Sequence, residues 1–190
     1  MLDEESVTDR PGGAGLAALL AAGQGHDVAL VTAIADDEAG SRLCELLTDA
    51  GIAVYPLPLP GATPEKVRLR ADGQVLVRLG PRRRPGGPGR PSEAALAVLR
   101  DASAILVSDY GRGVARNARL RAALQQAKAP VVWDRTPTGR PRCPTCALVT
   151  PNEAEVRKLA DDAGSGPMLS TVHRAGQQLR AALAGRRGRR

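Results

Sequence analysis

The chain has 190 residues, 43% of them hydrophobic, which is enough for a domain with a buried core and too apolar for wholesale disorder. The net charge of +7 argues only weakly for a nucleic-acid partner, because nearly all of the 27 basic residues are arginines that accompany an excess of Ala, Gly and Pro. No long apolar segment and no signal peptide is present, so we expect no membrane partner and a cytoplasmic location.

The first part of the chain alternates predicted helices and strands. An Ala- and Leu-rich segment over residues 13–23 predicts a helix, and residues 28–33 predict a buried strand. Residues 37–50 have the periodicity of an amphipathic helix, which Gly51 is expected to end. A further apolar segment follows at residues 52–57.

The pattern then changes to that of a β-hairpin. Residues 65–71 and 74–79 flank Asp72-Gly73, a dipeptide that strongly favours a tight turn between antiparallel strands. Side chains alternate along a strand, so the first strand is expected to have a cationic face (Lys66, Arg68, Arg70) and an apolar face (Val67, Leu69).

A linker rich in Pro, Gly and Arg at residues 81–91 precedes a second alternating region. We expect helices over residues 92–100, 114–127, 153–160 and 171–184, and strands over residues 104–107, 131–134 and 147–149. Short apolar strands separated by helices predict a mostly parallel sheet covered on both faces. Ligands bind beyond the carboxyl ends of such strands, so residues 108–113 and 150–155 are candidate site segments.

Three motifs have a functional and a purely structural interpretation. Residues 11–15 open a helix with glycines, which suits either a close-approaching ligand or an ordinary tight turn. Residues 150–155 place carboxylates in a first helical turn, where they either stabilise the helix end or hold a hydrated Mg ion. Residues 108–113 predict a glycine-rich turn that carries Asp and Arg, which is either a ligand-binding turn beyond a strand end or a plain turn. Cys143 and Cys146 lack the second ligand pair of a zinc site and the helix of a redox motif, which argues against a role for them.

Taken in order, five motifs resemble the pfkB or ribokinase-type carbohydrate kinases, closest to the kinase domain of D-glycero-beta-D-manno-heptose 7-phosphate kinases. The motifs are Pro11-Gly12-Gly13-Ala14, Asp36-Asp37 with Gly40, Lys66-Val67-Arg68 with Val77-Arg78-Leu79, Val107-Ser108-Asp109-Tyr110 with Arg112-Gly113, and Thr150-Pro151-Asn152 through Glu155. The resemblance extends from about Val7 to Ala184 and covers the middle part of the family's kinase domain.

The resemblance implies an α/β fold, a ribokinase-like three-layer αβα sandwich with a mostly parallel sheet and a small antiparallel β lid. This fold would be incomplete, lacking the first core strand and the C-terminal nucleotide-binding part. We expect one partial carbohydrate kinase domain over residues 1–190, with lid strands at about 2–10 and 54–79, an αβ core at about 11–53 and 92–184, and a basic tail at 185–190.

The resemblance also implies the substrates and the site residues. The family transfers a phosphoryl group from ATP, with Mg, to a sugar phosphate, here the anomeric hydroxyl of a heptose 7-phosphate. The implied substrate-binding residues are Gly12, Gly13, Lys66, Arg68 and Asp109. The implied cofactor-binding residues are Asn152, Glu153, Glu155 and Arg112, with Glu155 also near the metal. The β lid is expected to support a homodimer.

Three departures from the family pattern change the expected activity. Leu16 stands where the family has a sugar-binding Asn, and the first core strand with its sugar-binding Asp is missing. The Gly-Ala-Gly-Asp segment, which carries the catalytic base and an anion hole, is expected beyond residue 190. We therefore expect no turnover by this chain alone, unless a second polypeptide supplies that segment. The alternatives are a non-catalytic sugar-phosphate-binding or dimerisation module and, third, nucleic-acid binding through the arginine runs.

Overall fold

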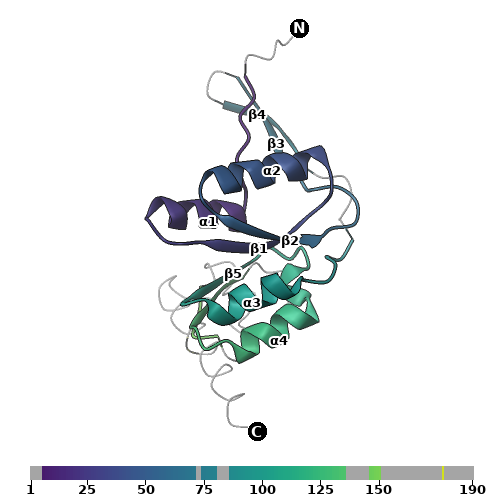
Figure 1. Cartoon of the computed structure of the whole chain (residues 1–190). Coiled ribbons are helices and arrows are strands. Elements are labelled where there is room, and N and C mark those ends of the chain that lie inside the picture. Colours follow the sequence, from purple (N-terminus) through teal and green to yellow (C-terminus); the bar gives the residue numbers. More distant parts are fainter. Residues whose placement is uncertain (1–5, 72–73, 81–85, 136–145, 151–176, 178–190) are drawn as a thin grey trace. The chain divides into compact units, whose positions relative to one another are not determined.

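The computed structural model describes residues 6–71, 74–80, 86–135, 146–150 and 177 (Figure 1). The chain divides into two compact units, Met1–Ala95 and Leu96–Arg190. Both units contain helices and parallel strands, and the first also contains an antiparallel pair. Within the described residues, no helix combines the length and the apolar character needed to cross a membrane.

The first unit is built on a β–α–β arrangement. β1 (Ala29–Ile34) pairs in parallel with β2 (Ala53–Pro58), and α2 (Glu38–Asp49) connects the two strands. α1 (Ala14–Gly23) precedes β1 and lies on the same side of the strand pair as α2 (Figure 1). The two helices and β1 share one apolar cluster, whose buried members are Ala18, Leu30, Leu47 and Ile52.

Local chemistry explains both ends of α2. Asp37 caps the helix, because its side chain accepts a hydrogen bond of 2.8 Å from the Gly40 N–H. Gly51 has a φ of 75°, a left-handed conformation that glycine adopts without strain, and the helix has stopped before it. The predicted helix is confirmed and is one residue shorter at each end.

The predicted hairpin is also confirmed. β3 (Val67–Ala71) and β4 (Gln74–Leu79) form an antiparallel pair, the ribbon, in which every residue of β4 is exposed. The register shifts between Leu69 and Arg70, so that Leu69 lies opposite Val77 while Arg70 lies opposite Val75. Leu76 is therefore an extra residue on β4, which makes this irregularity a β-bulge.

The expected lid boundaries differ from the structure at two places. Residues 54–58 belong to β2 and pair with β1, not with the ribbon, because this apolar segment returns beside β1 and buries Leu57 completely. Residues 6–10 contain no strand; Asp9 forms an ion pair with the Arg42 side chain. The ribbon is thus confined to β3 and β4 among the described residues.

The second unit contains a parallel three-stranded sheet in the order β5 (Ile105–Asp109), β6 (Val131–Arg135), β7 (Leu148–Val149). Trp133 is fully buried at the centre of its apolar cluster, together with Ile105, Ala115, Leu124 and Val131. α3 (Glu93–Asp101) begins before the division between the units and ends inside the second unit.

The helix predicted over residues 114–127 is divided in two. A short 3₁₀ helix, η1 (Val114–Arg116), is followed by α4 (Ala118–Gln126). Between them Asn117 has an extended conformation, and its side chain accepts hydrogen bonds from Arg119 N–H and Leu120 N–H. An Asn cap starts a new helix here, which helical periodicity does not reveal.

The helices predicted over 153–160 and 171–184 and the tail at 185–190 lie outside the described residues, apart from residue 177, which is helical.

Candidate functional site

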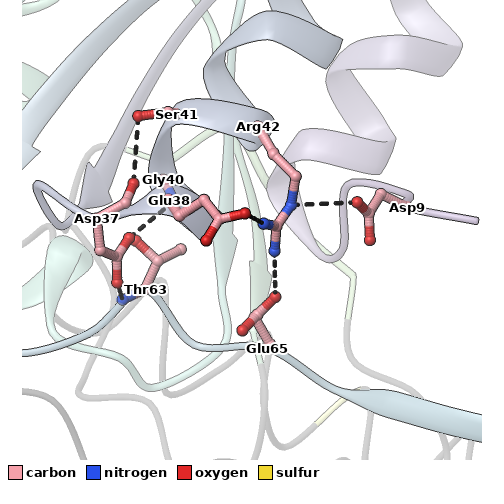
Figure 2. Close-up of polar contacts among 8 residues, drawn as sticks. All are labelled: Asp9, Asp37, Glu38, Gly40, Ser41, Arg42, Thr63 and Glu65. Carbon is pink, nitrogen blue, oxygen red and sulfur yellow. Dashed lines mark hydrogen bonds and ion pairs between the residues drawn. The ribbon is translucent and has the colours of Figure 1, made fainter. Parts of the chain in front are cut away.

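A group of polar side chains lies where β1 ends and α2 begins (Figure 2). The Ala35 N–H donates a hydrogen bond of 3.1 Å to the Thr63 hydroxyl, and the Thr63 N–H donates one of 2.7 Å to the Asp37 carboxylate. Thr63 is buried, with 8% of its surface exposed. Residue 63 is therefore bound to this junction by two hydrogen bonds, although it lies 26 positions after Asp37.

The same contacts keep the Asp37 carboxylate charged. The hydrogen bond from the Thr63 N–H is the main cause that lowers the pKa of Asp37 below its ordinary value. The Thr63 hydroxyl, the Gly40 N–H and the Arg42 charge lower this pKa further, while partial loss of water around the carboxylate opposes them. A charged carboxylate is the stronger acceptor for both N–H groups.

Arg42 joins three segments of the first unit. Its guanidinium contacts the carboxylate of Asp9 through Nε at 3.2 Å, of Glu38 through one terminal nitrogen at 2.8 Å, and of Glu65 through the other at 3.0 Å (Figure 2). Partial loss of water lowers the pKa of Arg42, but the three carboxylates raise it by more. We call these residues the Arg42 cluster, formed by Asp9, Glu38, Arg42 and Glu65.

The Arg42 cluster lies beside the sequence positions predicted to bind a substrate. Asp9 is followed by Gly12 and Gly13, and Glu65 is followed by Lys66 and Arg68. Gly13 caps α1 with a φ of 54°, so the glycine is needed there for its backbone conformation. Gly12 is exposed, and among the described residues, its chain neighbours aside, no atom lies within 4 Å of where a side chain there would begin.

Lys66 and Arg68 are exposed at the start of the ribbon, as expected for side chains that receive an anion. In the ribbon, Arg68 lies directly opposite Arg78. Without the bulge, a two-residue turn at residues 72–73 would place Arg68 opposite Val77 and Arg78 on the other face. The extra residue Leu76 therefore moves Arg78 to the face of Arg68, where the hairpin pattern did not predict it.

The opposite face of the ribbon is apolar. Val67 lies opposite Leu79, and Leu69 lies opposite Val77. All four side chains are exposed, at 46%, 52%, 47% and 43% respectively. The predicted separation into a cationic and an apolar face is confirmed for these positions, whereas Lys66 lies one residue before β3 begins.

The second unit contains the other described candidates, Asp109 and Arg112. Asp109 ends β5 with 5% of its surface exposed, and its carboxylate accepts a hydrogen bond of 2.9 Å from the Gly111 N–H. Gly111 and Gly113 both have positive φ, at 71° and 102°, which gives the tight turn that the sequence suggested. Arg112 is exposed on this turn. The carboxylate of Asp109 thus has a structural role as well as a position at a strand end.

Three of the four predicted cofactor-binding residues, including the one predicted near the metal, lie outside the described part of the chain. Asn152, Glu153 and Glu155 belong to this group, so the structure neither supports nor opposes their assigned roles. Within residues 6–71, 74–80, 86–135 and 146–150, no three His, Cys, Asp or Glu side chains are placed to hold a metal ion.

Comparison with known proteins connects these features to one family. Residues 1–187 match the pfkB family of carbohydrate kinases. The chain is 46% identical over 158 residues to the bifunctional protein HldE of Streptomyces coelicolor, covering 82% of this chain and 32% of that protein. It is 34% identical over 172 residues to the bifunctional protein HldE of Halorhodospira halophila, covering 87% of this chain and 36% of that protein. The chain therefore spans about a third of the length of these relatives.

Solved structures show the same fold. A carbohydrate kinase from Agrobacterium tumefaciens superposes with a TM-score of 0.63 at 17% identity, over 93% of this chain and 62% of that one. The tetrameric inhibited form of phosphofructokinase-2 from Escherichia coli superposes with a TM-score of 0.60 at 17% identity, over 93% of this chain and 60% of that one. The predicted ribokinase-like α/β fold is confirmed, and the chain corresponds to about 60% of these neighbours.

Proposed function

Because this chain belongs to the pfkB family of carbohydrate kinases, we propose that it takes part in phosphoryl transfer from ATP to a sugar phosphate. The proposed acceptor is a heptose 7-phosphate, phosphorylated at its anomeric hydroxyl. The observation that carries this proposal is the cationic face of the ribbon, where Arg68 lies opposite Arg78 and follows the exposed Lys66.

The chemistry of the ribbon suits a phosphate group that is already present on the sugar. Two guanidinium groups directly opposite each other repel when no anion is bound. A phosphate between them would remove this repulsion, and each planar guanidinium can donate two parallel hydrogen bonds to phosphate oxygens. Lys66 would add a compact charge near the same anion. An unphosphorylated sugar has no negative charge to offer these three cations.

The remaining candidate residues have proposed roles that follow from the family. The family pattern assigns Gly12, Gly13 and Asp109 to substrate binding. Asn152, Glu153, Glu155 and Arg112 would position ATP, with Glu155 near a Mg ion. A bound Mg ion would neutralise charge on the phosphoryl group as it transfers.

A calorimetric titration with heptose 7-phosphate tests the role of the ribbon. We expect Lys66→Gln and Arg68→Gln each to weaken binding by about tenfold or more, since a charge-assisted hydrogen bond contributes about 1.5–3 kcal/mol. Lys128→Gln is the matched control, because Lys128 is an exposed cation of the second unit, away from the ribbon in sequence. The proposed binding role is wrong if all three variants bind the sugar phosphate as the wild type does.

The apolar face of the ribbon supports a second candidate function, dimerisation. Its four exposed side chains form two cross-strand pairs, Val67 with Leu79 and Leu69 with Val77. A ribbon face of this kind is costly to leave in water, and a second copy of the same face would cover it. Sedimentation velocity of wild type and Leu69→Glu would show a shift from dimer to monomer if this face is the interface.

A further inference from the structure

We propose that Arg42 is a positioning residue for substrate binding: it holds the segments that carry Lys66 with Arg68 and Gly12 with Gly13 in a fixed relation. This inference rests on the proposed function, because it assumes that those residues receive the sugar phosphate. Arg42 itself lies on α2 and belongs to neither segment.

The geometry of the guanidinium supports this role. Each of its three nitrogens contacts a carboxylate from a different place in the chain, namely Asp9, Glu38 and Glu65. Asp9 lies three positions before Gly12, and Glu65 lies immediately before Lys66. A planar, rigid group that binds both segments fixes their separation and direction, which a flexible point charge cannot do.

A short segment connects the buried Thr63 to the ribbon. Thr63 is bound to Ala35 and Asp37, and β3 begins at Val67. Residues 64–66 lie between these points, and we call them the hinge segment. In the hinge segment, the Glu65 carboxylate accepts a hydrogen bond of 3.0 Å from the Arg42 guanidinium. Lys66 is the last residue of the hinge segment, so its position depends on this contact.

Stability alone does not explain the Arg42 cluster. The paired side chains are between 38% and 89% exposed, and ion pairs in water contribute little to the stability of a fold. The cluster also gathers three negative charges around a single positive one, which is more than neutralisation requires. Two of the three carboxylates, Asp9 and Glu65, lie shortly before predicted substrate-binding residues in the sequence, which suits a role in positioning those residues.

Hydrogen exchange of the 190-residue chain without ligand tests the positioning directly. We expect Arg42→Gln and Glu65→Gln to increase amide exchange in β3 and β4 by about twofold to fivefold, the range for loss of an exposed ion pair. Glu38→Gln is the matched control, because it removes the contact within α2 and leaves both contacts between segments. Exchange in β1 should stay as in the wild type for all three variants. An unchanged ribbon in Arg42→Gln, or an equal increase throughout the first unit, would overturn the inference.

Binding of heptose 7-phosphate provides a second readout. We expect Arg42→Gln and Glu65→Gln to raise the Kd by about twofold to fivefold, with Glu38→Gln unchanged. A wild type that binds no sugar phosphate would contradict the proposed function, while the exchange experiment would still decide the role of Arg42. Normal binding by Arg42→Gln, with the wild type binding, would contradict the positioning role.

Discussion

At the residue scale, Asp37 and Gly40 fix the turn that joins β1 to α2. The Asp37 carboxylate accepts hydrogen bonds from Gly40 and Thr63, and so binds the start of the helix and the approach to the ribbon together. Gly40 is buried, and a side chain there would overlap the Ala35 carbonyl oxygen and lie 2.8 Å from the Ile34 methyl group. The sequence shows the two residues as a family motif, but the close approach to Ala35 becomes visible only in three dimensions.

Replacing Gly40 by Ala should destabilise the first unit. The added methyl group has no space, and overpacking of this kind costs about 1–3 kcal/mol. Gly23→Ala is a suitable control, because Gly23 ends α1 with nothing within 4 Å of a new side chain. That control should be neutral or stabilising by up to about 1 kcal/mol. Urea unfolding followed by circular dichroism measures both; equal midpoints for the two variants would contradict the assigned role of Gly40.

Asp37 should make stability depend on pH in the acid range. Its pKa is lower in the folded chain than the ordinary value of 3.8, so the carboxylate stabilises the fold fully above that value. The contribution is lost as the pH falls through the folded pKa. We therefore expect the difference in unfolding midpoint between wild type and Asp37→Asn to shrink from about pH 7 to about pH 2.5. Asp36→Asn, at an exposed neighbour that makes none of these hydrogen bonds, should show no such change. A difference that grows toward acid pH would contradict this explanation.

At the element scale, the ribbon was largely predictable because its signal is local. Asp72-Gly73 between two alternating segments indicates a hairpin without knowledge of the rest of the chain. The pairing of Arg68 with Arg78 was not predictable, since it depends on Leu76 as an extra residue in β4. Bulges are set by the twist and packing of the pair and leave no mark in a two-residue period. The break at Asn117 between η1 and α4 was not predicted either, because the helical periodicity of the sequence continues across it.

The Arg68–Arg78 pair predicts a ribbon that is tightened by anions. Arg78→Gln should stabilise the ribbon without ligand by about 0.2–1 kcal/mol, because it removes one of two like charges on directly opposite residues. It should also reduce the additional protection that inorganic phosphate gives to the amides of β3 and β4. Hydrogen exchange with and without phosphate measures both effects. If phosphate protects the ribbon of Arg78→Gln as strongly as that of the wild type, Arg78 has no part in anion binding.

At the scale of the whole molecule, the α/β class follows from the alternation of short apolar strands with helices. That pattern is distributed over the chain, so errors at single boundaries do not change the class. The boundaries that were wrong, such as assigning residues 54–58 to the lid, lie where an apolar segment could pair with either of two neighbours. Long-range pairing decides such cases. The roles of the predicted substrate-binding residues stay predictions; Gly12 and Lys66 lie in the first unit and Asp109 in the second.

The most direct test of the central claim is an amide chemical-shift titration of the wild-type chain with heptose 7-phosphate and, separately, with the unphosphorylated heptose. The proposed site predicts that the phosphorylated sugar shifts the amides at Lys66, Arg68 and Arg78 and near Gly12 most strongly, and that the unphosphorylated sugar leaves the ribbon nearly unchanged. An equal response to the two sugars, or a ribbon unaffected by both, would contradict the claim that this cationic face recognises a sugar phosphate.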